Sequence, residues 1–162
     1  MLNYKKMYEI YFDGACEPIN PSGTASYGFL IKKDGKIIAH ESKIIGSGDG
    51  MTNNLAEYRG LIASLRYLLT RNPLTHNPLT IFTDSSLVYN MVAKNWGWSK
   101  KKTIWRPHKD HPHLKKLLFE ALKLLENFQY QIKWIPREQN QGADSLSKKP
   151  LIEKGIVSNN LV

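Results

Sequence analysis

The chain has 162 residues and a formal net charge of +9, from 23 Lys and Arg against 14 Asp and Glu, with 41% hydrophobic residues. This length fits one domain with a substantial core, and the positive charge favours a polyanionic partner such as a nucleic acid. Cys16 is the single cysteine, and no apolar run approaches the ~20 residues of a membrane span, which excludes an internal disulfide, a thiolate metal cluster and a membrane helix.

The N-terminal half has the pattern of three strands followed by a long helix. Strands are predicted over residues 7–12, 26–33 and 36–45, and a helix from Thr52 or Asn53 to about Arg71. The first strand alternates apolar and other side chains and runs into Asp13-Gly14, which indicates that it ends there in a turn. Asp34-Gly35 separates the second and third strands and is a preferred pair for a two-residue hairpin turn.

The C-terminal half alternates between strands and helices. Strands are predicted over residues 79–83 and 129–135, and helices over residues 85–94, 113–128 and 141–147. Pro150 and Gly155 argue against a longer last helix, so the predicted domain covers residues 1–148 and a tail covers residues 149–162. A hairpin-bearing start followed by strand–helix alternation predicts an α/β fold with a mixed sheet.

Four acidic side chains stand at the ends or starts of these elements: Asp13, Glu57, Asp84 and Asp144. Glu57 lies four residues before Leu61, on the apolar stripe of its helix, where an acid needs a partner. If the four meet, they form a cage of hard oxygen ligands for Mg²⁺ or Mn²⁺, which suits chemistry on a nucleic-acid phosphate. Taken singly, Asp84 and Asp144 are also explained as helix caps or surface charges.

The residues around these acids form four motifs whose order and spacing match those of a known protein family. The motifs are Phe12-Asp13-Gly14, the helix start from Thr52 to Tyr58, Thr83-Asp84-Ser85, and Asn140 four residues before Asp144. Over residues 7–148 the chain resembles a type I ribonuclease H. The resemblance implies a five-stranded mixed sheet in the order 3-2-1-4-5 with helices on both faces. It also implies an endoribonuclease that cleaves the RNA strand of RNA–DNA hybrids and leaves 5′-phosphate and 3′-hydroxyl ends.

The resemblance further implies a site with two Mg²⁺ ions, for which Mn²⁺ is a possible substitute. In that family the first carboxylate, here Asp13, bridges the two ions. Glu57 and Asp84 would hold the ion on the leaving-group side, and Asp144 would help to hold the ion that carries the attacking water.

The resemblance also assigns three neutral residues to substrate binding. Asn20 and Asn53 are expected in the minor groove, where hydrogen bonds to 2′-hydroxyls distinguish RNA, and Thr52 at a phosphate of the DNA strand. A second interpretation makes Asn20 and Asn53 ordinary turn and cap residues. One departure concerns the loop of residues 135–140, which lacks the histidine that many bacterial relatives carry there. Arg137 or Glu138 are the candidates to take its part.

A basic segment, residues 94–116, lies between two predicted helices. It contains eight Lys or Arg against one Asp, and three of the four tryptophans. Basic residues interleaved with aromatic ones suit a groove that follows a phosphate backbone. The residues expected to bind substrate are Trp96, Trp98, Lys100, Lys101, Lys102 and Arg106. A solvated loop is the alternative for this segment, and a polar loop is favoured over a transition-metal site for His108, His111 and His113.

The expected partner is an RNA–DNA hybrid, bound by a monomeric protein with no membrane association and no obligate protein partner. The N-terminal residues lack the apolar run of a signal peptide, so a cytoplasmic location is expected. Three other functions stay open. A non-catalytic hybrid-binding module would be expected to lack a carboxylate, and a transposase or integrase core would need differently spaced acids and further domains. A domain of a reverse transcriptase is the third.

Overall fold

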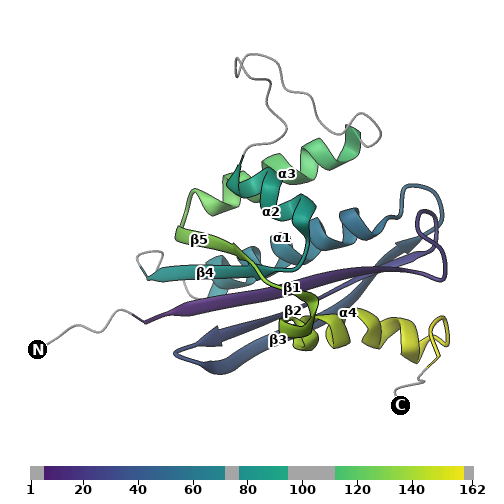
Figure 1. The fold of residues 1–162 in the computed structure, drawn as a ribbon, viewed down its shortest axis with the longest axis horizontal. Helices are drawn as coiled ribbons and strands as arrows, with labels where there is room; N and C mark the ends of the chain where they lie inside the picture. The colour runs from purple at the N-terminus through teal and green to yellow at the C-terminus, as the bar shows by residue number, and fades with distance from the viewer. Residues whose placement is uncertain (1–5, 72–76, 95–111, 159–162) are drawn as a thin grey trace, which may run out of the picture.

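The computed structural model describes residues 6–71, 77–94 and 112–158, and five strands form one mixed sheet in the order β3-β2-β1-β4-β5 (Figure 1). The strands are β1 (Tyr8–Glu17), β2 (Thr24–Lys33), β3 (Lys36–Ser47), β4 (Pro78–Thr83) and β5 (Gln129–Trp134). The helices are α1 (Asn53–Arg71), α2 (Ser86–Ala93), α3 (Pro112–Leu125) and α4 (Gln141–Glu153), with a 3-10 turn η1 (Arg137–Gln139). The first three strands pair antiparallel, and β4 is parallel to β1 and β5. The predicted fold class and strand order are confirmed.

Helices cover both faces of the sheet, as expected. α1, α2 and α3 lie on one side and α4 lies alone on the other (Figure 1). The core between α1 and the central strands is largely apolar, with Phe12, Phe29 and Leu61 each 0% exposed. In the described ranges, no helix combines the length and apolar character that crossing a bilayer requires.

The start of α1 is set by its cap. The Thr52 hydroxyl accepts a hydrogen bond from the backbone N–H of Leu55 at 3.0 Å, which satisfies one of the free donors of the first turn. From that start, Leu61, Leu65 and Leu68 fall on one face and are buried, as predicted from their spacing. The same phase turns Glu57 inward, where it is 5% exposed.

Two glycines let helices approach the sheet closely, one on each face. A Cβ on Gly14 would lie 2.4 Å from the backbone nitrogen of Glu57 on α1. A Cβ on Gly28 would lie 2.4 Å from the backbone nitrogen of Ser147 on α4. Because neither backbone can yield to such a contact, only glycine permits this spacing. The two glycines therefore set how near α1 and α4 come to the centre of the sheet.

The two largest errors in the predicted boundaries concern β1 and α4, while α3 ends at Leu125 rather than at residue 128. Asp13-Gly14 does not end β1, because residues 13–17 continue to pair with β2 as far as Glu17 opposite Thr24. The last helix does not end at Ser147: α4 continues to Glu153 with Pro150 inside it. The burial of Leu151, which is 0% exposed, offsets the backbone hydrogen bond that a proline removes. The predicted boundary between domain and tail at residue 148 therefore lies inside α4.

Candidate active site

The parallel pairing of β1 with β4 brings two of the four acids together. Tyr11 lies opposite Phe82 in the register, and their rings stack with centroids 4.7 Å apart. Asp13 and Asp84 each lie two residues beyond this last parallel pair. They therefore come side by side, Asp13 on β1 and Asp84 just after the end of β4. Sites in α/β sheets form beyond the carboxyl ends of parallel strands for this reason.

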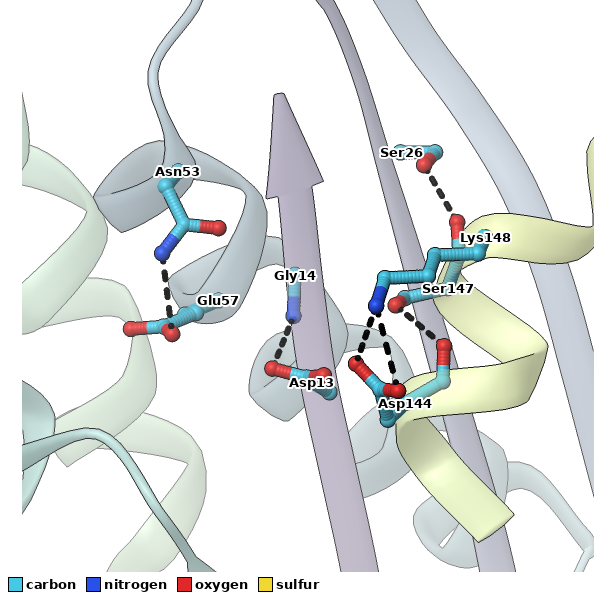
Figure 2. A network of polar contacts seen from close by, with 8 residues as sticks. All are labelled: Asp13, Gly14, Ser26, Asn53, Glu57, Asp144, Ser147 and Lys148. Atoms are coloured by element: carbon cyan, nitrogen blue, oxygen red, sulfur yellow. Dashed lines mark hydrogen bonds and ion pairs between the residues drawn. The ribbon is translucent and has the colours of Figure 1, made fainter. Parts of the chain in front are cut away.

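Glu57 completes a three-carboxylate cluster from the neighbouring helix. One carboxylate oxygen each of Asp13, Glu57 and Asp84 can be chosen so that all three lie within 4.8 Å of one another. Figure 2 shows Asp13 on β1 between Glu57 on α1 and Asp144 on α4. Asp13 is 4% exposed, so the cluster sits at the edge of the core rather than on the outer surface. Three of the four predicted acids therefore meet at this cluster, and Asp144 lies beside Asp13 on α4 (Figure 2).

Asp84 is held by the turn that leads from β4 into α2. The Thr83 hydroxyl accepts from the backbone N–H of Ser85 at 3.0 Å, and the Trp134 indole N–H donates to the backbone carbonyl of Asp84 at 3.2 Å. Ser85 is the cap of α2, since its hydroxyl accepts from Val88 N–H at 3.2 Å. Asp84 is therefore not a helix cap, and its carboxylate remains available to the cluster.

Asn140 connects the start of α4 to β1, the strand that carries Asp13, through a side-chain hydrogen bond. Its side-chain N–H donates to the backbone carbonyl of Phe12 at 2.9 Å, and the residue is 1% exposed. Its side chain also hydrogen-bonds the Asp84 carboxylate. Asn140 occupies the cap position of α4, so Asp144 in the first helical turn is not the cap either.

Burial and mutual repulsion raise the pKa values of the clustered acids. The pKa of Asp13 is raised to about 8, first by burial, then by the charges of Asp84 and Glu57 and by a hydrogen bond with Asp144. Burial raises the pKa of Glu57 to about 7, against opposing hydrogen bonds from Ser85 and Asn53. Burial likewise raises the pKa of Asp84, against the opposing charge of Arg137. Oxygen donors that repel one another in this way fit a divalent cation, which relieves the repulsion.

Comparison with known proteins shows the family of this chain. A family model described as RNase H matches residues 5–151. The chain belongs to the RNase H family. It is 36% identical over 151 residues to the ribonuclease H of Pelobacter propionicus, covering 90% of this chain and 85% of that protein.

Two solved structures extend the likeness of this RNase H family chain to three dimensions. The RNase H1 of the halophilic archaeon Halobacterium salinarum matches with a TM-score of 0.72 and 28% identity, over 91% of this chain and 98% of that one. LC11-RNase H1, isolated from compost and solved in complex with an RNA/DNA hybrid, matches with a TM-score of 0.74 and 25% identity. That match covers 93% of this chain and 99% of the LC11 chain.

The predicted minor-groove residues of this RNase H chain lie beside the acids. The Asn53 side-chain N–H donates to Glu57 at 3.3 Å, and the Asn53 backbone N–H donates to the Asn20 side chain at 3.1 Å. Both asparagines line a pocket of about 340 Å³ that also reaches Asp144. Thr52 is 8% exposed and serves as the cap of α1. The other residues predicted to bind substrate lie outside the described residues, namely Trp96, Trp98, Lys100, Lys101, Lys102 and Arg106.

Sequence reasoning missed the residues that hold the acids in place. It did not predict that Ser85 hydrogen-bonds Glu57 or that Asn140 hydrogen-bonds Asp84. Nor did it identify Lys148, which forms an ion pair with Asp144. An available signal was the spacing of four residues between Asp144 and Lys148, which pairs side chains on a helix. The predicted end of the helix at Ser147 concealed it.

We expect the RNase H chain without divalent metal to lose stability as the pH rises. The raised pKa of Asp13, about 8 against an ordinary 3.8, means that between these values the folded state binds a proton that the unfolded state does not. The free energy of unfolding then falls by up to about 1.4 kcal/mol per pH unit for each such proton, or roughly 3–5 °C in Tm. Thermal melts in EDTA from pH 5 to 8 measure the slope.

The variant Asp13→Asn should reduce this slope, because asparagine carries no titrating proton, and the raised pKa of Glu57, about 7, accounts for the slope that remains. Asp34→Asn is the matched control. Asp34 lies in the turn between β2 and β3, away from the acids, and its carboxylate accepts a hydrogen bond from the backbone N–H of Met7, just before β1, at 3.0 Å. An equal slope in the Asp13→Asn variant would show that Asp13 is not the group that titrates. Saturating Mg²⁺ should raise Tm most at high pH.

Proposed function

We propose that this chain is an endoribonuclease that hydrolyses the RNA strand of RNA–DNA hybrids and leaves 5′-phosphate and 3′-hydroxyl ends. The observation that carries the proposal is the convergence of Asp13, Glu57 and Asp84 within 4.8 Å in a chain of the RNase H family. Support for the substrate comes from LC11-RNase H1, a relative solved with an RNA/DNA hybrid. The net charge of +9 suits such a polyanion.

The proposed cofactor is a pair of Mg²⁺ ions, with Mn²⁺ as a substitute. Asp13 would contribute to both ions, Glu57 and Asp84 to the one on the leaving-group side, and Asp144 to the other. When bound, such a pair supplies an activated water and stabilises the charge that develops on the leaving oxygen. Carboxylate oxygens favour these hard ions, whereas Zn²⁺ favours His and Cys ligands.

The surrounding side chains keep the carboxylates oriented for that task. Ser85 and Asn53 both hydrogen-bond the Glu57 carboxylate. Asn140 joins Asp84 to the backbone of β1. Glu57 and Asp84 each have such a neighbour from another element, so these two ligands are oriented before the ions arrive.

For the substrate, the pocket beside the acids is the proposed place of the RNA strand. Asn20 and Asn53 line it together with Arg137, so amide groups and a positive charge face the same space. Amides suit 2′-hydroxyls, and a guanidinium suits phosphate. Thr52 and the basic residues of the segment 94–116 stay predicted contacts to the DNA strand. A monomeric state and a cytoplasmic location also stay predictions.

One gel tests the proposal. End-labelled RNA is supplied as a hybrid with DNA, as a single strand and as an RNA duplex, each with Mg²⁺, Mn²⁺ or EDTA. We expect cleavage of the hybrid that disappears in EDTA, with products carrying 3′-hydroxyl ends that a polymerase extends. Hybrid binding without cleavage under either metal would favour the non-catalytic binding module instead.

A further inference from the structure

A lysine ammonium occupies the open side of Asp144. Lys148 Nζ lies 3.2 Å from Oδ1 and 3.3 Å from Oδ2 of Asp144, so one cation contacts both carboxylate oxygens (Figure 2). The two residues are four apart on α4, and this spacing brings their side chains together. The pair is only partly buried, with side-chain exposures of 37% for Lys148 and 25% for Asp144. Lys148 thus takes up the oxygens that Asp144 would offer to a metal ion.

The position of Asp144 makes this contact more than a helix-surface pair. Its carboxyl group also lies beside Asp13, the centre of the acidic cluster (Figure 2). A divalent ion shared by Asp13 and Asp144 would need the oxygens that Lys148 contacts. The ammonium and the ion therefore compete, both for ligand atoms and through the repulsion of like charges.

A second partner is available to the Lys148 ammonium in the pocket beside the acids. It lines the pocket of about 340 Å³ together with Asn20, Asn53 and Arg137. Glu17 is the only other carboxylate among the described residues of this lining, and the hydrogen bond and the ion pair of Lys148 both go to Asp144. A phosphate in the pocket would meet two positive side chains, Lys148 and Arg137. The long, flexible lysine side chain allows its ammonium to turn from the carboxylate to such a phosphate.

We propose that Lys148 is a positioning residue that exchanges partners during loading of the site. It holds the Asp144 carboxylate in the metal-free protein, and it turns to a backbone phosphate of the bound nucleic acid when a divalent ion takes Asp144. The proposal rests on the proposed function. A partly exposed pair of this kind is weak enough for the exchange to be reversible.

Metal binding to the free protein tests the first half of the exchange. In Lys148→Gln, titration with Mn²⁺ alone, followed by calorimetry, should show binding about two- to fivefold tighter than in the unaltered chain, because no ammonium has to be displaced. Lys148→Arg keeps a cation at the site and should restore the weaker binding. Lys149→Gln is the matched control, since it removes the same charge from an exposed neighbour on α4. Equal or weaker Mn²⁺ binding in Lys148→Gln overturns the proposal.

Hybrid binding tests the second half. With Ca²⁺ present and the hybrid shown to be intact on the gel, Lys148→Gln should weaken binding by about two- to fivefold, the loss of one partly exposed charge contact. In EDTA the same variant should bind like the unaltered chain, because Lys148 is then engaged by Asp144. If Lys148→Gln lowers the affinity for the hybrid equally in Ca²⁺ and in EDTA, the proposed exchange is wrong.

The readouts separate this idea from the proposed function. If the unaltered chain cleaves no hybrid while Mn²⁺ affinity still responds to Lys148→Gln, the proposed function fails and the metal competition stands. If the chain cleaves and Mn²⁺ affinity does not respond, the exchange fails alone. A purely structural role of the Asp144–Lys148 pair would change Tm and leave Mn²⁺ affinity unaltered, which also rejects the exchange.

Discussion

Replacing Asp84 with Asn should reduce hybrid cleavage at least about a thousandfold while the fold persists. Asn keeps the shape of the side chain but removes the charge and one metal-binding oxygen. The fold should persist because the Asp84 backbone carbonyl, which accepts from Trp134, is unchanged. Burial already raises the pKa of Asp84, so removal of its charge relieves strain in the metal-free cluster. Single-turnover cleavage with Mg²⁺ measures the loss, and a melt in EDTA checks the fold.

The control for this variant is again Asp34→Asn, which makes the same chemical change outside the site. Asp34 has a φ of 51° in the hairpin between β2 and β3, a conformation that Asn tolerates well. We expect this control to cleave at the unaltered rate. Near-normal cleavage by Asp84→Asn would overturn the assignment of the cluster as the catalytic centre.

Replacing Gly28 with Ala should both destabilise the protein and impair cleavage. The added Cβ would lie 2.4 Å from Ser147 N and 2.5 Å from the backbone carbon of Leu146, so α4 has to move away from β2. Overpacking of this kind costs about 1–3 kcal/mol, which corresponds to roughly 3–10 °C in Tm for a chain of this size. Cleavage should fall as well, because α4 carries Asp144 to its place beside Asp13. Thermal melts and cleavage assays measure the two effects.

The matched control is Gly46→Ala on β3. Its new Cβ would meet only the flexible Met51 side chain, with the sulfur 3.4 Å away. This variant should stay close to the unaltered chain in both Tm and cleavage. A Gly28→Ala protein with unchanged Tm would mean that α4 does not lie as close to the sheet as described.

Local patterns predicted most of the fold because they reflect local physics. The alternation of β1 and the leucine spacing of α1 follow directly from the geometry of strands and helices. The same spacing turned Glu57 inward, and the structure confirms its burial. Errors arose where a partner from elsewhere in the chain overrides a local signal. Pairing with β2 extends β1 beyond Asp13-Gly14, and the burial of Leu151 lets α4 continue beyond Pro150.

The sequence by itself predicted the acids of the candidate site and the elements on which they lie, and it determined which family the chain resembles. Only the tertiary structure decided that Asp13, Glu57 and Asp84 meet within 4.8 Å, and that Asp144 lies beside Asp13 and pairs with Lys148 (Figure 2). The reason is physical. Periodicity and capping act over a few neighbouring residues, whereas the meeting of carboxylates depends on strand register and on how closely Gly14 and Gly28 let two helices approach one sheet.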